Sequence, residues 1–274
     1  MKRFLTAVAL AAAASFPAVA SIAPGATGDG ELFLVAHDDI AKVSFTYDLG
    51  IRMDAFFVSG QTNGFSSSWA VGSDANWSSF TGQVTAANIR WAVVALDTTG
   101  NLNPGFQRLF TTVFQNPALS QAQITAGISN TTNAGLSTGI GFPGLNFLGA
   151  VNNTGTHPPQ SDFTINGSSV NALDASFAYF GRSGSLTPTY NGNASFNSTN
   201  ALGVSSTFYY LTRSSTNQNG TVLADIFDGT AGVGNFTFTG NALTYAVPVP
   251  EPTTYGLMAL GLLAIGLKVR RRLG

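Results

Sequence analysis

The sequence predicts an all-β protein: an antiparallel β-sandwich of jelly-roll character with a short helical and glycine-rich insertion, plus a single C-terminal transmembrane helix. Three observations support the β prediction. Short segments alternate apolar and polar side chains, glycine- and asparagine-rich stretches separate them, and 21 phenylalanines can fill a core. Only 9% of the 274 residues are charged, against roughly 25% in an ordinary soluble domain. We therefore expect a surface of neutral polar groups.

The first twenty residues have the pattern of a secretory signal peptide. Lys2 and Arg3 form a basic start, residues 4–16 are apolar, and residues 18–20 read Ala-Val-Ala, a small-residue cleavage site. A core helix is the alternative, but the stretch has no amphipathic period. We expect cleavage before Ser21 and export of the remaining chain.

The body, residues 21–247, contains the predicted strands. Residues 42–49 alternate without a break, with Val, Phe, Tyr and Leu on one face and Lys, Ser, Thr and Asp on the other. Further predicted strands are residues 32–36, 55–58, 89–96, 109–114, 176–180, 207–211, 236–239 and 243–247. About ten short strands of this kind suit two packed antiparallel sheets.

An insertion at about residues 116–149 interrupts the strand pattern. Asn116 is a candidate helix cap, Pro117 suits a first helical turn, and apolar residues recur at helical spacing up to Gly127. We expect a short helix and a glycine-rich excursion across one end of the sandwich. So long a connection is either functional or poorly packed.

The C-terminal end combines three different elements in order. Val-Pro-Glu-Pro at 249–252 precedes a mainly apolar stretch at 253–269, whose uncharged part is 255–267, and an arginine cluster follows at 270–272. At about 1.5 Å per residue the stretch reaches roughly 25 Å, slightly less than the ~30 Å hydrocarbon core of a bilayer. We predict a transmembrane helix with the arginines on the cytoplasmic side. A buried core helix is the alternative, because the uncharged run at 255–267 is short.

This order of elements resembles the PEP-CTERM sorting signal of exported Gram-negative bacterial proteins, here at residues 248–274. The resemblance implies that exosortase, a membrane-embedded processing enzyme, recognises the Pro-Glu-Pro tripeptide and removes the helix. Prolines keep such a tripeptide extended and available for binding. The sorting residues are Pro250, Glu251, Pro252, Arg270, Arg271 and Arg272.

The same resemblance implies where the protein acts. The chain would be anchored in the inner membrane before processing and reach the cell surface or extracellular matrix afterwards, in association with biofilm and exopolysaccharide. Residues 28–50 add a weaker resemblance to the openings of PEP-CTERM proteins that have no assigned activity.

Charge and cysteine content exclude several functions. Without both ends, residues 21–250 contain six Lys and Arg and twelve Asp and Glu, a formal net charge of −6. An acidic body with scattered bases has no footprint for nucleic acid, so no nucleic-acid partner is expected. The lack of cysteine excludes disulfides, thiolate metal sites and thiol nucleophiles.

One segment matches a hydrolase nucleophile motif. Residues 135–139 read Gly-Leu-Ser-Thr-Gly, with Ser137 in the nucleophile position. The motif requires an acid and then a histidine downstream, yet no Asp or Glu lies between Ser137 and His157, the only later histidine. We therefore expect a protein that is not an enzyme, and keep a secreted hydrolase as the least favoured hypothesis.

His37, Asp38 and Asp39 bring an imidazole and two carboxylates together. Asp38 and Asp39 are candidate calcium ligands, because calcium accepts carboxylate and backbone oxygens in loops. The preferred interpretation is a solvated polar turn after a strand, since no known calcium motif is present. No other cofactor is expected.

Three tryptophans raise the question of carbohydrate binding. Trp91 lies in an apolar segment and is expected in the core, whereas Trp69 and Trp77 lie in a polar, glycine-rich segment. Packing is favoured for both, and an exposed stacking ring is the alternative. We expect a non-catalytic, exported surface or matrix protein that contacts polysaccharide or copies of itself. A carbohydrate-binding or calcium-dependent adhesion module is the alternative.

Overall fold

The computed structural model describes residues 21–26, 28–100, 102–140, 142–154, 167–172, 177–180, 189–190 and 193–249. The predicted signal peptide at 1–20 and the predicted transmembrane helix at 253–269 lie outside these residues. Within the described ranges, no helix has both the length and the apolar character needed to cross a bilayer.

Antiparallel strands dominate the described part of the chain, which also contains five short α-helices and two 3₁₀ turns. The strands are β1 (Glu31–Asp38), β2 (Val43–Arg52), β3 (Ser66–Trp69), β4 (Arg90–Asp97), β5 (Arg108–Thr112), β6 (Ser168–Ala172), β7 (Thr189–Tyr190), β8 (Asn193–Asn197), β9 (Asn200–Ala201), β10 (Ser205–Thr212), β11 (Leu223–Ile226), β12 (Asp228–Gly229), β13 (Gly232–Val233), β14 (Asn235–Phe238) and β15 (Leu243–Ala246). The helical segments are α1 (Met53–Ser59), η1 (Val71–Ser73), α2 (Ala75–Thr81), η2 (Ala86–Asn88), α3 (Gln121–Ser129), α4 (Asn133–Ile140) and α5 (Phe142–Asn152).

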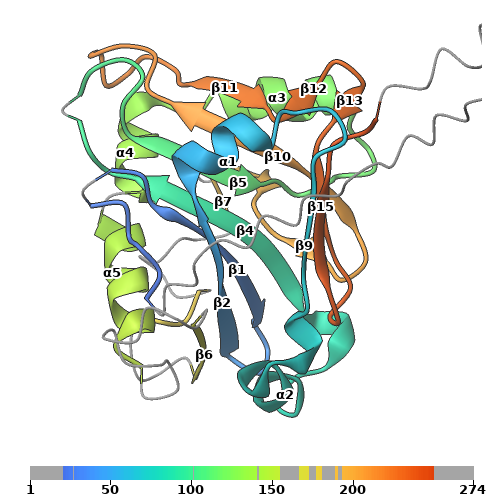
Figure 1. Cartoon of the computed structure of the whole chain (residues 1–274). Coiled ribbons are helices and arrows are strands. Elements are labelled where there is room, and N and C mark those ends of the chain that lie inside the picture. Colours follow the sequence, from blue (N-terminus) through green and yellow to red (C-terminus); the bar gives the residue numbers. More distant parts are fainter. Residues whose placement is uncertain are drawn as a thin grey trace, which may run out of the picture.

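Most strands belong to one curled sheet (Figure 1). Its order is β3-β15-β14-β10-β5-β4-β1-β2-β6, with β11 beside β10 and β9 beside β4. The mostly β, antiparallel prediction is confirmed, but the two separate sheets of a jelly roll are not found among the described residues. The reason lies in β10, where residues 205–207 pair with β14 and residues 208–211 pair with β5, so that hydrogen bonding continues around the bend.

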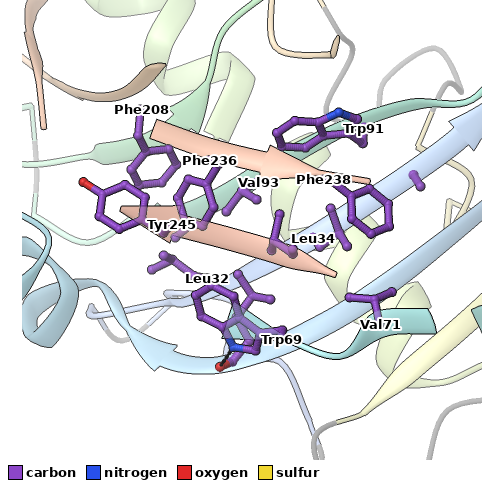
Figure 2. Close-up of a cluster of buried hydrophobic side chains, with 14 of the residues drawn as sticks. Leu32, Leu34, Trp69, Val71, Trp91, Val93, Phe208, Phe236, Phe238 and Tyr245 are labelled. Atoms are coloured by element: carbon purple, nitrogen blue, oxygen red, sulfur yellow. Dashed lines mark hydrogen bonds between the residues drawn. The ribbon is translucent and has the colours of Figure 1, made fainter. Parts of the chain in front are cut away.

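The concave face of this sheet encloses an aromatic core (Figure 2). Phe236, Phe238 and Tyr245 of β14 and β15 share one buried cluster with Leu32 and Leu34 of β1. Aromatic rings remove large apolar areas from water, which allows a chain with few charges to form a stable core. The segments predicted as strands at 32–36, 42–49, 89–96, 109–114, 207–211, 236–239 and 243–247 overlap β1, β2, β4, β5, β10, β14 and β15.

The convex face is covered by helices α3, α4 and α5. Phe33 and Val35 of β1 point to this side and pack in a second cluster with Phe147 and Val151 of α5. Every residue of β1 is therefore buried. Burial of both faces also explains why apolar and polar residues do not alternate along this strand. Helices on one side and curled strands on the other bury both faces of the central strands.

Two short helices lie against the concave core. Met53 and Phe56 of α1 are buried, whereas Ala55 and Val58 are exposed. The predicted strand at 55–58 is therefore wrong. The segment is helical, and the two apolar residues that it buries, Met53 and Phe56, are three positions apart, as on one face of a helix. At α2, the Asp74 carboxylate accepts a hydrogen bond from Trp77 N at 3.0 Å and caps the helix.

The insertion is more helical than expected. Ser120, not Asn116, caps α3, and its hydroxyl and Gln123 form a reciprocal capping box. Asn116 instead accepts a hydrogen bond from Ala118 N at 3.0 Å in a local turn. The glycine-rich part forms α4 and α5 and covers the sheet. Residues 177–180 form a turn, so the predicted strand at 176–180 is wrong where it is described.

Candidate functional site

The polar cluster at the end of β1 is built around a tight turn. Asp38 Oδ1 accepts hydrogen bonds from Ile40 N at 2.8 Å and Ala41 N at 3.1 Å, and Lys42 then adopts a φ of 60°. Burial raises the pKa of the Asp38 carboxyl, but the backbone donors, Ala41 N first, outweigh burial and hold the pKa below its usual value. Asp38 therefore stabilises the turn.

Asp39 is engaged by two side chains. Its Oδ1 lies 3.1 Å from His37 Nδ1 and accepts a hydrogen bond from the Tyr179 hydroxyl at 2.7 Å. The hydrogen bond with His37 is the main cause that lowers the pKa of Asp39 to about 2. In the described part of the chain, no three His, Asp or Glu side chains converge on a metal-sized site. Calcium binding at Asp38 and Asp39 stays a prediction.

The structure places the tryptophans in the core. Trp69 is 9% exposed and its Nε1 donates to Leu49 O at 2.9 Å (Figure 2). Trp77 is 5% exposed, with ring centroids of Phe45, Phe80 and Phe238 between 5.1 and 5.2 Å away. Both rings are packed in the core, which is the interpretation that the sequence favoured, and neither exposes a face on which a sugar could stack. Trp91 is fully buried, as expected.

Ser137 lies inside helix α4 rather than on a turn after a strand. Its hydroxyl donates to Asn133 O at 2.8 Å and accepts from Arg213 Nη1 at 2.7 Å. His157, the histidine considered with it, lies outside the described residues. The Ser137 hydroxyl therefore links α4 to Arg213. The sharp turn from strand to helix that a nucleophile elbow requires is not formed at this position.

Arg213 is fully buried and surrounded by neutral acceptors. Its guanidinium donates to the carbonyl oxygens of Leu102, Asn133 and Ser215 at 3.2 to 3.3 Å, and to the Ser137 hydroxyl. These bonds join α4 to the loop before β5. Arg213 therefore connects structural elements, a role that sequence alone did not suggest.

A polar stripe runs along the convex face of β2. Ser44 Oγ donates to Ala178 O at 3.1 Å, whereas Thr46 Oγ1 and Asp48 Oδ2 are buried without a hydrogen-bond partner in the described structure. Burial, and then the charge of Glu31, raise the pKa of Asp48 to about 8. Such a carboxyl is largely protonated at neutral pH. A perturbed pKa is compatible with a functional site but also with a buried structural carboxyl.

A pocket opens between α1, β10 and β11. Its cavity volume is about 460 Å³, and its walls include Phe57, Gln61, Tyr210, Thr212 and Asp225. Tyr210 and Asp225 are cross-strand partners, so their side chains share the concave side of the sheet. The sequence suggested Asp225 only as a conceivable calcium ligand and did not group these residues into one site, because Phe57 and Tyr210 look like ordinary core positions. Only the fold brings α1 against β10 and β11.

The chain leaves this fold from an interior strand. β15 pairs with β14 on one side and with β3 on the other. Beyond it, Val247 N donates to Phe65 O at 2.9 Å, and Gly64 N donates to the carbonyl oxygens of Val247 and Pro248 at 3.2 Å. Gly64 has a φ of 75°, and a Cβ there would lie 3.2 Å from the Val249 side chain. Backbone hydrogen bonds therefore hold the chain to the body as far as Pro248.

The segment that follows carries the recognised signal. A protein-family profile described as the PEP-CTERM protein-sorting motif matches residues 248–272. No curated protein and no solved structure matches the chain. The predicted sorting signal is confirmed, and this chain is an exosortase-targeted protein destined for export and sorting to the cell surface. The sorting residues Pro250, Glu251, Pro252, Arg270, Arg271 and Arg272 lie outside the described residues.

Proposed function

We propose that the protein is a non-catalytic component of the cell surface or extracellular matrix, associated with biofilm and exopolysaccharide. It is anchored briefly in the inner membrane, processed by exosortase and then released. The observation that carries this proposal is the sorting motif at 248–272, attached directly to a folded β-rich body. The neutral polar composition of that body suits contact with hydrated polysaccharide or with other copies.

The short distance between body and signal supports processing of a folded protein close to the membrane. Pro248 is held by the body and is followed by Val249, Pro250 and Glu251. Three residues span at most about 11 Å even when fully extended. Exosortase would therefore meet the tripeptide next to the surface formed by Gly64 and the end of β15.

A Glu251→Ala variant tests the sorting step. We expect full-length protein to accumulate in the inner membrane, whereas the wild type is found outside in a shortened form. Cell fractionation with mass spectrometry of the C-terminus measures both. Asp228→Ala, which removes an exposed acid from the body, is the matched control and should be released normally. Release of Glu251→Ala at the wild-type level would contradict tripeptide recognition.

The second candidate function is a carbohydrate-binding or calcium-dependent adhesion module. The pocket lined by Phe57, Tyr210 and Asp225 supports carbohydrate binding. It replaces Trp69 and Trp77, which are buried, as the candidate binding site. The calcium form depends on Asp38 and Asp39. It requires calcium to raise the melting temperature of the wild type but not of Asp39→Asn. Equal responses of the two proteins would exclude that site.

A further inference from the structure

The pocket between α1, β10 and β11 has an aromatic wall that its neighbours hold in place. The Phe57 ring meets the Tyr210 ring at a centroid distance of 5.2 Å and an angle of 65°. It also lies 6.0 Å from the rings of Phe110 and Phe227. Phe57 nevertheless remains 37% exposed. A ring fixed by three others loses little conformational freedom when a ligand covers its open part.

Polar groups lie beside this ring. Gln61 Nε2 donates to Phe57 O at 2.6 Å, which positions the amide and leaves its oxygen as an acceptor. Asp225 is exposed, and one carboxylate oxygen accepts from Ile226 N at 2.9 Å. The second oxygen has no such contact among the described residues. The pocket thus offers acceptors to a ligand that donates several hydrogen bonds.

The charges near the pocket disfavour an anionic ligand. None of the described lining residues is cationic, and Asp225 supplies a negative charge. On the same helix as Phe57, Asp54 binds Arg108 Nη1 at 2.6 Å, and Arg108 Nη2 lies 2.8 Å from Asp97. These carboxylates occupy the guanidinium, and their hydrogen bonds outweigh burial to raise the Arg108 pKa. Among the described residues that line the pocket, phosphate and uronate groups would therefore find no cationic partner.

We infer that this pocket binds one neutral hexopyranose residue of a polysaccharide. The apolar face of the sugar ring packs against Phe57, and its hydroxyl groups donate to Asp225 and Gln61. The cavity volume of about 460 Å³ falls within the range of small-molecule sites and admits a single sugar ring with water. The inference rests on the proposed function only for the source of the sugar, the polysaccharide outside the cell.

The test uses the full-length chain purified in detergent, so that it does not depend on sorting. Cellopentaose, laminaripentaose and mannopentaose are titrated by isothermal calorimetry up to about 10 mM, beyond the usual range of specific weak sites. Oligogalacturonate of similar length is the anionic comparison. We expect at least one neutral probe to bind and the anionic probe to bind at least about tenfold more weakly.

Two variants locate the binding site. We expect Phe57→Ala and Asp225→Asn each to weaken the binding of that neutral probe by about tenfold, the cost of one lost contact of this strength. Val58→Ala on the same helix and Asp228→Asn near the same edge are matched controls with unchanged affinity. Asp225→Asn keeps the shape and an acceptor for Ile226 N, so it remains informative even where Phe57→Ala impairs folding.

Three results would overturn the inference. They are the absence of binding by every neutral probe, unchanged affinity in Asp225→Asn together with any folded Phe57→Ala, or tighter binding of oligogalacturonate than of the neutral probes. Because binding is measured on purified protein, these results leave the sorting proposal untouched. Conversely, normal release of Glu251→Ala would contradict sorting without affecting the pocket.

Discussion

The two faces of the central strands β1, β4, β5 and β10 bury different chemistry. On the concave face, the Phe56 ring is surrounded by five other aromatic rings with centroids 4.9 to 6.1 Å away. On the convex face, the cluster is mainly aliphatic with fewer rings, among them Phe147 of α5, and buried polar groups lie on the same side. On the same side of the neighbouring strand β2, Thr46 Oγ1 and Asp48 Oδ2 have no hydrogen-bond partner among the described residues, and beyond β10 Arg213 is enclosed by carbonyls.

The two faces should therefore contribute differently to the free energy of unfolding and to its dependence on pH. Packed rings need no specific hydrogen-bond partner and stabilise the fold over a wide range of conditions. A buried polar group stabilises only when its partners are present, and a buried acid also responds to pH. We therefore expect the concave face to set the overall stability and the convex face to set its dependence on pH.

Phe56→Ala should have the largest effect. The change removes a buried ring from five ring contacts, so we expect the free energy of unfolding to fall by about 4–5 kcal/mol, the upper part of the range for such truncations. Phe147→Ala is the matched control on the convex face, where the ring meets only Phe33 and Phe180 among the described rings. We expect about 3 kcal/mol there. Equal losses in urea unfolding would remove the proposed difference between the faces.

Arg213→Ala should come next. The substitution leaves the buried carbonyl oxygens of Leu102, Asn133 and Ser215 without their donor, at a cost of about 3 kcal/mol. Amide hydrogen exchange should also increase in α4, which Arg213 holds. Arg213→Lys keeps the charge but lacks the planar group of donors, so it should recover only part of the loss. A loss below about 1 kcal/mol in Arg213→Ala would show that the network contributes little.

Asp48→Asn should have an effect that depends on pH and disappears in acid. The ordinary pKa of this carboxyl is 3.8, whereas burial and the charge of Glu31 raise it to about 8 in the folded protein. Between these values the unfolded chain releases the proton and the folded protein keeps it, so wild-type stability falls as pH rises. Asp48→Asn removes this dependence.

We expect Asp48→Asn to be more stable than the wild type by on the order of 5 kcal/mol at pH 8, since the pKa shift spans about four pH units at about 1.4 kcal/mol each, and nearly equal to it at about pH 3.5. Urea unfolding at a series of pH values measures the difference. Asp39→Asn is the matched control with the opposite sign, because the folded-state pKa of Asp39 is lowered to about 2. A constant difference between Asp48→Asn and wild type across this range would contradict the buried-acid interpretation.

Strands were predicted correctly where apolar and polar side chains alternate, or aromatic side chains recur, within one short segment. The alternation at 42–49 identified β2, and the aromatic segments near the C-terminus identified β14 and β15. Strand prediction failed at α1, because seven residues contain too few turns for a helical period to be distinguished from a strand. At α3, the cap predicted at Asn116 is wrong, because Ser120 and Gln123 form the capping box, a signal that can be read in the sequence.

The candidate sites differ in the same way. The sorting motif was predictable because its proline, apolar and arginine elements follow one another in the chain. Trp69 and Trp77 were ambiguous, since polar neighbours in the sequence do not show that β14, β15 and β2 cover the rings. The pocket was not predictable, because Phe57 and Tyr210 are separated by more than half of the chain.

By itself, the sequence determined the β-rich character, the acidic and cysteine-free body and the sorting signal at its C-terminal end. These properties depend on composition or on neighbouring residues. Only the tertiary structure decided that one sheet curls around an aromatic core, that helices bury the polar face of β2, and that Phe57 meets Tyr210 and Asp225 in an open pocket. Such features arise from contacts between distant segments, and the balance of burial and hydrogen bonding across these contacts is not written in any single segment.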